Sequence, residues 1–518
     1  MPALAIILGA FASFGGFLFG YDTGYISGCK EMEHFLQSYG DLQPDGTYIL
    51  SSGTDSLITS ILSAGTFVGS LFASTIGDWI GRRMGVVVYL VVFCVGVALQ
   101  TAAKGNVGTF AAGRVLAGLG VGGTSCLVPI YQAECAPKKI RGIIVSAYQF
   151  FITFGLLIAA VVVNGTKNHS GASSYRIPIA LQFIWAAILA VGMFILPESP
   201  RWLVLKGRTA DAKRSLSRLL GAEEEGPDVT AQLDEIEGNL EHERQSGGGT
   251  WADCFRQGET KNFQRVATGC IFQALTQLSG INFIFYYGTT FFRHSGISDP
   301  FLITIATNVV NVGMTIPGMI LTDYLGRRPM VMYGAFGMAV CQIIVAAVGV
   351  SISVDNAAGQ KVLVAFVCIF IAHFASCYGP LSWVITSELY PYNIRTKGMS
   401  LSTASNWLFN FAIGYATPYL VNTGPGNAGL QSNVFWIWGG CCALGVVFAY
   451  FMIPETKQLS LEQVDLIYRH STPRKSVAYR KKIINDNIVE GTTARRLSTY
   501  SLGGAEKKAS QEVKVESV

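Results

Sequence analysis

Two stretches of seven residues, GDWIGRR at 77–83 and TDYLGRR at 322–328, decide the fold of this chain. Each follows an apolar run and places an aspartate, a glycine and two adjacent arginines at the same positions. They lie 245 residues apart (323 minus 78) in a chain of 518 residues. A repeat at this distance predicts two related halves that follow one another in the sequence.

Two more pairs of landmarks repeat in the same order and at a similar distance. They are Glu134 with Arg141, which recur as Glu388 with Arg395 254 residues on (388 minus 134), and PESPR at 197–201, which returns as PETK at 454–457, 257 residues on (454 minus 197). Three matched landmarks in one order indicate a duplicated architecture rather than chance.

The composition indicates a protein that crosses the membrane many times. Only 14% of the residues are charged, against about 25% in an ordinary soluble protein, and the mean hydropathy is positive at +0.39. Apolar runs long enough to cross a bilayer occur at about 4–28, 54–77, 84–103, 108–132, 142–164, 176–196, 265–290, 299–322, 330–352, 361–387, 398–421 and 433–453. We therefore expect an all-α membrane protein of twelve transmembrane helices in two pseudo-symmetric halves of six.

This division also predicts the domains and the orientation. The expected parts are an N-terminal half at 1–199, linker helices at 200–262, a C-terminal half at 263–453 and a tail at 454–518. Basic residues cluster in alternate loops, so the positive-inside rule places both termini and the linker in the cytoplasm. Asn164 and Asn168 begin two glycosylation sequons in an external loop, and an unused triplet is the alternative.

Several classes of function are not supported. The net charge of +5 is small and spread out, which gives no reason to expect a nucleic-acid partner. The eleven cysteines form no CxxC pair and lie mostly in apolar runs, which argues against a zinc site or a disulfide framework. No GxxxxGK[ST] phosphate loop is present, so we expect neither an ATP-driven pump nor another enzyme, and no cofactor or metal.

The seventh apolar run carries amides where lipid would tolerate none. Gln273 and Gln277 lie one helical turn apart, and Asn282 follows Gly280, which allows the backbone to bend. These side chains predict a polar face turned into the helix bundle. Hydrogen bonding between helices and contact with a ligand are both open at this point.

A further group of motifs makes a resemblance clear. Besides the two repeated loops, PESPR and PETK, they are FGYDTGYISG at 19–28, GRVLAG at 113–118, QLSGIN at 277–282 and GPLSW at 379–383. Over about residues 4–470 the chain resembles the sugar porter branch of the major facilitator superfamily, and FGYDTGYISG is most similar to fungal hexose transporters. The resemblance implies the twelve-helix fold that alternates between inward and outward states, together with an intracellular helical domain.

The resemblance also implies a set of residues that bind sugar. They are Gln149, Gln273, Gln277, Asn282, Asn311, Trp383, Asn406 and Trp407. Amides both donate and accept hydrogen bonds, which suits a ring of hydroxyls, and hydrogen bonding between helices is the alternative role. Thr276 stands where many hexose porters have a second glutamine, so the affinity and the preferred hexose stay open. Tyr286 and Tyr287 are candidates for an external lid or for interfacial anchors.

Asp22 and Arg114 are candidates for coupling sugar movement to a proton. Asp22 is the acidic side chain at depth in the first run, where a charge is costly without a partner, and Arg114 is the strong cation at similar depth. Separation of the two charges in one conformation would raise the pKa of the aspartate and allow proton uptake. The resemblance implies the same pair, while a permanent structural ion pair is the alternative. His373 is a further candidate proton carrier, more simply interpreted as a packed neutral residue.

The repeated charged residues are predicted to form a cytoplasmic gate. They are Asp78, Arg82, Arg83, Glu134, Arg141, Asp323, Arg327, Arg328, Glu388 and Arg395. Ion pairs among them would hold the outward-facing state closed and would break on inward opening, with PESPR and PETK tying the linker into the same latch. A purely topological role for the positive charges is the alternative.

These observations together predict a plasma-membrane hexose transporter, with glucose as the expected sugar and a proton as co-substrate. A facilitative uniporter and a non-transporting glucose sensor of the same fold are the alternatives, and other polyols, quinate or disaccharides are possible substrates. The polar tail contains RRLS at 495–498, which makes Ser498 a candidate phosphorylation site. The sequence does not predict how the protein is regulated, its oligomeric state or a protein partner.

Overall fold

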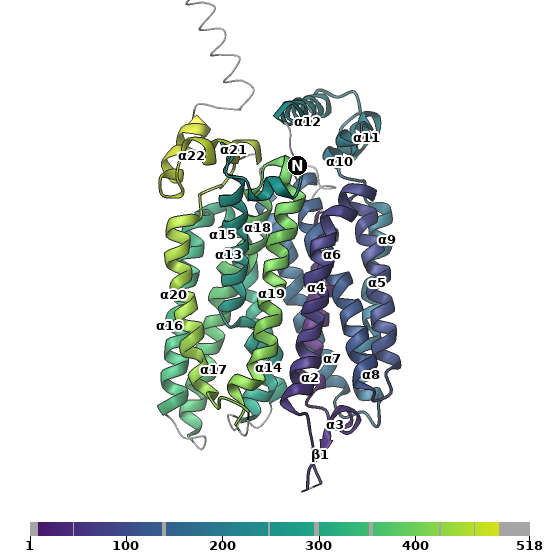
Figure 1. Ribbon diagram of the computed structural model, residues 1–518, viewed down its shortest axis with the longest axis vertical. Coiled ribbons are helices and arrows are strands. Elements are labelled where there is room, and N and C mark those ends of the chain that lie inside the picture. Colours follow the sequence, from purple (N-terminus) through teal and green to yellow (C-terminus); the bar gives the residue numbers. More distant parts are fainter. Residues whose placement is uncertain are drawn as a thin grey trace, which may run out of the picture.

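The computed structural model describes residues 9–44, 46–136, 141–246, 249–294, 300–351, 356–423, 426–459 and 461–485. Ser498 and the side chain of Arg141 lie outside the described residues. Helices run side by side through the body of the molecule, and shorter helices cover one end of it (Figure 1).

The N-terminal half supplies six helical positions across this body. They are α2 (Phe14–Cys29), α4 (Ser52–Ile80), α5 (Arg82–Ala102), α6 (Val107–Cys135), α7 (Arg141–Thr166) and the consecutive pair α8 (Ser173–Ala180) and α9 (Gln182–Ile195). Glycines let α4 and α6 approach closely, since a Cβ on Gly122 would lie 2.2 Å from the carbonyl oxygen of Thr66. The glycine run at 118–123 therefore packs helices, as its place inside an apolar run indicates.

The C-terminal half supplies six more. They are α13 (Asn262–Leu278) with α14 (Ile281–His294), α15 (Pro300–Leu325), α16 (Arg327–Ser351), α17 (Ala357–His373) with the π-turn η2 (Phe374–Tyr378) and α18 (Gly379–Leu389), α19 (Arg395–Val421) and α20 (Val434–Met452). These boundaries agree within a few residues with the apolar runs of the sequence.

Within the described residues, nine helical stretches are long and apolar enough to cross a membrane. The helices at the other three positions are too short, broken or too polar to be counted. Helix α2 is only 16 residues long, α13 and α14 are separated at Gly280, and α19 carries polar side chains such as Asn406 and Asn410. Gly280 has φ +83°, and a Cβ there would lie 2.5 Å from the Trp438 ring, so this break suits glycine.

The two ends of the molecule carry different short elements. The end that we call the linker face carries α10 (Pro200–Leu205), α11 (Thr209–Leu220), α12 (Pro227–Ser246), η1 (Ala252–Phe255), η3 (Tyr392–Ile394), α21 (Leu461–His470), η5 (Pro473–Lys475) and α22 (Ser476–Asn485). The opposite end, the hairpin face, carries α3 (Glu33–Tyr39), the antiparallel strands β1 (Asp41–Leu42) and β2 (Tyr48–Ile49), and η4 (Gln431–Asn433). Figure 1 shows the two faces at its upper and lower ends.

The halves meet along several pairs of helices. Helix α4 packs against α19, α7 packs against α15 and α18, and α2 packs against α14. Residues on these helices therefore lie between the halves, which is where a twelve-helix transporter places its substrate site.

Candidate functional site

One contact between the halves joins an amide to an indole. The Nε1–H group of Trp383 in α18 donates to Oε1 of Gln149 in α7 at 3.1 Å. The ring of Tyr148 meets the Trp383 ring edge-on, with centroids 5.2 Å apart. Gln149 and Trp383 were both predicted to bind sugar, and the structure brings them together across the interface between the halves.

A second group of predicted residues meets inside the C-terminal half. Gln273 donates through Nε2 to the carbonyl oxygen of Ser382 at 3.1 Å and accepts through Oε1 from Nδ2 of Asn406 at 2.7 Å. The other amide atom of Asn406, Oδ1, is buried and has no hydrogen-bond partner among the described residues. This oxygen is therefore a free acceptor beside an ordered amide pair.

A third group extends from the break between α13 and α14. Oε1 of Gln277 accepts from Asn282 and, at 3.3 Å, from Asn410. Oδ1 of Asn410 accepts in turn from Ser63 at 2.6 Å and from Tyr286 at 2.9 Å. The sequence prediction missed Asn410, although it lies one helical turn after Asn406 on the same face of α19.

Asn311 differs from the other amides. Its side chain in α15 is fully buried, and neither its nitrogen nor its oxygen has a hydrogen-bond partner among the described residues. Leaving a buried amide unpaired costs roughly 1–3 kcal/mol for each missing partner, so such groups normally meet water or a ligand. Asn311 therefore stays a candidate contact for a polar ligand, and Gln182 of α9 is a second buried amide without a partner among the described residues.

The side chains at two other positions named in the sequence analysis, Trp407 and Thr276, donate hydrogen bonds to other groups of the protein. The Nε1–H group of Trp407 donates to Oγ of Ser125 at 3.1 Å, and Phe19 meets the Trp407 ring edge-on at 4.8 Å. Oγ1 of Thr276 donates to the Phe272 carbonyl oxygen at 2.9 Å. Trp407 thus holds α19 against α6, while the Thr276 hydroxyl bonds its own helix and does not take the place of a second amide.

Asp22 and Arg114 lie next to each other in the N-terminal half, both fully buried. Oδ1 of Asp22 is 3.6 Å from Nη1 of Arg114. The Arg114 guanidinium donates its hydrogen bonds to other groups. Nε donates to the Ile58 carbonyl oxygen at 3.2 Å, and Nη1 donates to the Tyr25 hydroxyl at 3.0 Å. Neither Asp22 oxygen has a hydrogen-bond donor among the described residues. Among the described residues, Arg114 is thus the neighbour that compensates the charge of Asp22.

The hairpin face is closed by contacts between the halves. Nζ of Lys30 lies 4.0 Å above the ring of Tyr287 in the other half. Contacts within each half hold these two residues: Lys30 pairs with Asp55 at 2.6 Å, and the Tyr287 hydroxyl donates to the Gly414 carbonyl oxygen at 2.7 Å. Ser27 of α2 contacts Thr289 of α14 at 3.2 Å. Tyr286 instead points at Asn410, so the two adjacent tyrosines serve different neighbours.

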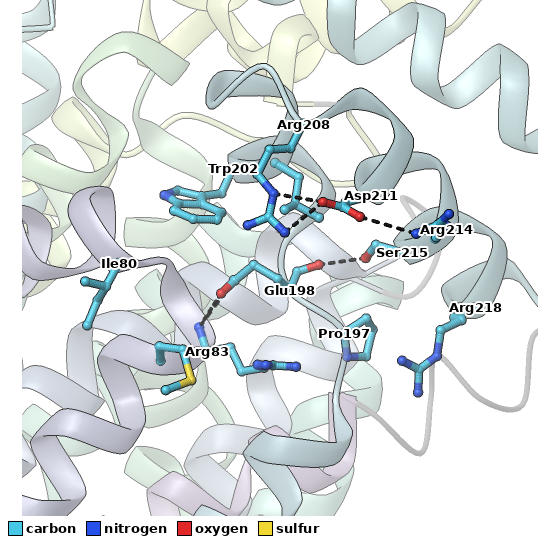
Figure 2. Close-up of a pocket in the computed structure, with 12 residues that line it drawn as sticks. Ile80, Arg83, Pro197, Glu198, Trp202, Arg208, Asp211, Arg214, Ser215 and Arg218 are labelled. Atoms are coloured by element: carbon cyan, nitrogen blue, oxygen red, sulfur yellow. Dashed lines mark hydrogen bonds and ion pairs between the residues drawn. The ribbon is translucent and has the colours of Figure 1, made fainter.

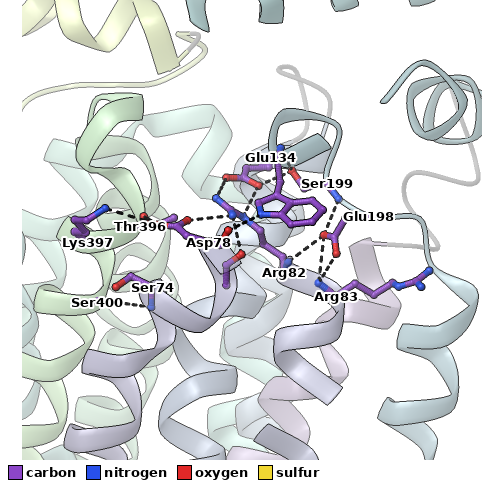
Figure 3. A network of polar contacts seen from close by, with 12 residues as sticks. Ser74, Asp78, Arg82, Arg83, Glu134, Glu198, Ser199, Thr396, Lys397 and Ser400 are labelled. Atoms are coloured by element: carbon purple, nitrogen blue, oxygen red, sulfur yellow. Dashed lines mark hydrogen bonds and ion pairs between the residues drawn. The ribbon is translucent and has the colours of Figure 1, made fainter. Parts of the chain in front are cut away.

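On the linker face, Arg82 is the centre of a cluster that we call the N latch, formed by Asp78, Arg82, Glu134, Glu198 and Ser199 (Figure 3). Arg82 makes two parallel hydrogen bonds to Glu134, both at 3.1 Å, and a third to Asp78 at 3.2 Å. Ser199 donates to Glu134 at 2.5 Å. Glu198 accepts from the backbone N–H groups of Arg82 and Arg83 at 3.1 Å. Burial raises the pKa of Glu198, and these donors partly oppose the shift.

The C-terminal half repeats this arrangement in the C latch, formed by Asp323, Arg327, Glu388, Glu455 and Thr456. Arg327 binds Glu388 at 2.8 and 3.2 Å and Asp323 at 3.0 Å. Thr456 donates to Glu388 at 2.6 Å, and Glu455 accepts from the backbone N–H groups of Arg327 and Arg328 at 3.1 and 3.2 Å. PESPR and PETK thus contribute equivalent residues to the two latches.

The predicted gate residues form ion pairs mainly inside each half. Links across the halves on this face include those of Asp78, whose Oδ2 accepts from Thr396 at 3.1 Å and lies 3.7 Å from Nζ of Lys397 (Figure 3). The backbone N–H group of Ser74 also donates to Oγ of Ser400 in the other half at 3.2 Å. Arg83 and Arg328 donate their side chains to backbone carbonyls of Leu196 and Tyr450, and Arg395 donates to the Tyr390 carbonyl oxygen. Thr396 was not a predicted gate residue.

His373 lies apart from all of these groups. Its Nδ1 is 2.9 Å from the Ile369 carbonyl oxygen, and its ring is 5.6 Å from that of Tyr333 in α16. This is the packed position that its apolar neighbours indicate.

The fold and the buried polar groups between its halves define a membrane transporter of the major facilitator superfamily. The family described as "Sugar (and other) transporter" matches residues 8–468, and the chain belongs to this family. It is a transporter and not an enzyme. The predictions of twelve transmembrane helices and of sugar porter membership are confirmed.

Named relatives agree with this assignment. The chain is 49% identical to the major facilitator-type transporter ecdD of Aspergillus rugulosus, covering 92% of this chain and 90% of the relative. It is 44% identical to the probable glucose transporter rco-3 of Neurospora crassa, covering 90% and 79%. It is 42% identical to the high glucose sensor RGT2 of Saccharomyces cerevisiae, covering 90% of this chain but 61% of the sensor.

A solved structure has the same fold. The proton:xylose symporter XylE bound to 6-bromo-6-deoxy-D-glucose superposes with a TM-score of 0.79 at 26% identity, covering 90% of this chain and 100% of that one. The inward-open conformation of XylE from E. coli gives a TM-score of 0.68.

Proposed function

We propose that this protein carries a hexose, with glucose as the expected substrate, across the plasma membrane by alternating access together with a proton. The observation that carries the proposal is the buried, unpaired amide of Asn311 on α15, a helix that packs against α7 of the other half, where Gln149 meets Trp383 across the same interface. A neutral molecule bearing many hydroxyls matches donors and acceptors of this kind without needing a charge.

Alternating access follows from the contacts on the two faces. The Lys30 and Tyr287 contacts join the halves on the hairpin face, and the Asp78 contacts with Thr396 and Lys397 join them on the linker face. Breaking one set at a time would open the site to one side only. The linker face is cytoplasmic in this proposal, with both termini on that side, because basic residues gather there.

Proton coupling is supported by the geometry around Asp22. A fully buried carboxylate without a hydrogen-bond donor depends on Arg114 for its charge, so a small movement of α6 would favour the protonated acid. The relative named as a probable glucose transporter supports glucose as the substrate, and the proton symporter XylE supports coupling to a proton.

The test is uptake of labelled glucose in a yeast strain without hexose transporters. We expect saturable uptake that a protonophore reduces, and Asp22→Asn should remove this sensitivity to the protonophore. Asp228→Asn, at an exposed aspartate of α12, is the control and should behave as the natural protein. Uptake that ignores both the protonophore and Asp22→Asn would leave a facilitative uniporter.

A glucose sensor is the second candidate, because RGT2 is similar over 90% of this chain. The chain spans only 61% of that sensor, so the similarity does not extend over the whole of it. Two results together would favour this second function. Cells that contain the protein would show glucose-dependent signalling, and vesicles that contain the purified protein would take up no sugar.

A further inference from the structure

Among the described residues, two clefts on the linker face differ in the charged side chains that line them. The first, of about 270 Å³, lies between the end of α4 and helices α10 and α11 and contains four arginines, Arg83, Arg208, Arg214 and Arg218. Asp211 sits between Arg208 and Arg214 at 2.7 and 3.6 Å, and Glu198 lies in the same wall (Figure 2). The first cleft thus supplies its own counter-ions.

The second cleft, of about 600 Å³, has less compensation. It lies between the start of α13 and helices α21 and α22, and its basic lining comprises Lys261, Arg469, His470, Lys475 and Lys482. No carboxylate lines it among the residues that the structure describes. Arg469 pairs with Asp465 behind the lining at 2.7 Å, whereas Lys261, Lys475 and Lys482 form no ion pair among the described residues. Lysines that share one cleft repel each other, so the site favours a multivalent anion.

Helix α22 is held so that one face is presented to this cleft. Oγ of Ser476 accepts from the backbone N–H group of Glu455 at 2.9 Å, Arg480 donates to the Lys457 carbonyl oxygen at 2.6 Å, and Ile483 is fully buried. These three residues anchor one side of the helix. Lys475, Tyr479 and Lys482 follow one another at spacings of four and three residues and line the cleft along another side.

The opposite wall is also rigid. Asp465 of α21 pairs with the buried Arg265 of α13 and accepts from Arg469 at 2.7 Å. Lys261 directly precedes α13 and donates to the Ser471 carbonyl oxygen at 3.5 Å. It has φ +52°, a left-handed conformation that glycine or asparagine adopts more readily than lysine. Lys261 and Arg469 are therefore held in place by contacts within the fold.

Residues next to the cleft contact the end of a membrane-crossing helix. The Arg474 guanidinium stacks 4.2 Å from the ring of Phe451, and Arg328 lies 5.3 Å from the ring of Tyr450. Both rings are exposed at the end of α20, which is one of the membrane-crossing helices. Residues 473–485 contain five basic residues and no acidic one, a composition that favours anionic lipid next to a transmembrane helix.

We propose that the second cleft binds the phosphorylated headgroup of an anionic membrane lipid of the phosphoinositide type. A headgroup with several phosphates supplies the multivalent anion that the lysines of the cleft favour, and its acyl chains can remain in the bilayer beside α20. The proposal takes the linker face as cytoplasmic, as proposed above. It does not depend on which sugar is transported.

The experiment measures binding to the purified full-length protein in neutral phosphatidylcholine nanodiscs. The probes are dioctanoyl phosphatidylinositol bisphosphate, dioctanoyl phosphatidylcholine and free inositol trisphosphate. We expect the first probe to bind, the second not to bind, and the third to bind more weakly than the first because it lacks the membrane anchor. Equal binding of the free headgroup would support the phosphate site but contradict a lipid as its natural source.

Two adjacent lysines of α22 form a matched pair of variants. Lys482→Gln removes a charge that lines the cleft, and Lys481→Gln removes an exposed charge that does not. We expect Lys482→Gln to weaken binding about fivefold and Lys475→Gln with Lys482→Gln about 25-fold, while Lys481→Gln changes it less than twofold. Unfolding midpoints of all variants are measured alongside to show that they are folded. Equal effects of Lys481→Gln and Lys482→Gln, or no binding of the lipid at all, would overturn the proposal.

Discussion

The N latch and the C latch have the same internal contacts but different external ones. In each, an arginine makes paired bonds to a glutamate from another helix and a third bond to the aspartate four residues earlier. The second oxygen of Asp78 then reaches Thr396 and Lys397 of the other half. The corresponding oxygen of Asp323 is buried without a hydrogen-bond partner among the described residues.

This difference separates two tasks that the repeated motif performs. The arginine–glutamate pairs hold helix ends together inside a half, so they need not change when the halves rock. The contact of Asp78 with α19 spans the halves and has to break when the linker face opens. Structural stability is therefore expected to depend on both latches equally, and the balance between conformations mainly on the N latch.

The largest effect is expected from removing either central arginine. Arg82→Ala and Arg327→Ala each leave a buried glutamate without its partner, which destabilises a protein by about 3–5 kcal/mol. Both variants should lose most of the folded protein, as measured by size-exclusion chromatography of a fluorescent fusion. Normal yield of one variant beside loss of the other would contradict the equivalence of the two latches.

A smaller and unequal effect is expected at the aspartates. Asp78→Asn weakens the charged contact between halves, worth about 1.5–3 kcal/mol, so the state open at the linker face should gain about tenfold in population. Cys126 reports this opening because it is buried 3.5 Å from Ser400 of the other half. We expect faster alkylation of Cys126 in Asp78→Asn than in Asp323→Asn.

The control for this measurement is Cys126→Ser, which should remove the alkylated peptide from the mass spectrum. Equal acceleration by Asp78→Asn and Asp323→Asn would show that the crossing contact has no special role in closure.

Lys397→Gln tests the weaker part of the same contact. Its ion pair with Asp78 is 3.7 Å long and partly exposed, so it contributes roughly 0.2–1 kcal/mol. The alkylation rate of Cys126 should rise by about fivefold at most, less than in Asp78→Asn. A larger rise in Lys397→Gln would mean that the lysine, and not Thr396, holds the halves together.

The smallest effect concerns pH. Burial raises the pKa of Glu198 above its ordinary value of 4.5, so the folded protein binds this proton more tightly than the unfolded chain does. Stability from this group is present at acidic pH and is lost as pH rises from the ordinary value through the raised one. Glu198→Gln should therefore flatten the fall of the melting midpoint across that window. An unchanged slope would contradict this assignment.

The sequence predicts the fold well because its signals are local. Twelve apolar runs and three repeated landmarks can be identified without knowing how the halves pack or where they lie relative to each other. The break at Gly280 is indicated by its residue type, whereas the π-turn at 374–378 lies inside a run expected to be one continuous helix.

The sites are predicted less completely because they depend on how the halves meet. Asn410 belongs to no quoted motif, and its role is visible only from its bonds to Ser63 and Tyr286. The different second oxygens of Asp78 and Asp323 cannot follow from a repeat that makes the two aspartates equivalent. The roles of the proposed sugar and proton residues remain predictions for the experiments described above.

The central claim is that amides between the two halves bind a neutral sugar, and its most direct test is equilibrium binding of glucose to the purified protein by calorimetry. Asn311→Leu is compared with Gln182→Leu, which changes another buried amide without recorded bonds, in α9, a helix that packs on α2 and α5 of its own half. We predict saturable binding that Asn311→Leu weakens at least about tenfold and Gln182→Leu leaves unchanged. Equal affinity in the natural protein and both folded variants would contradict the claim.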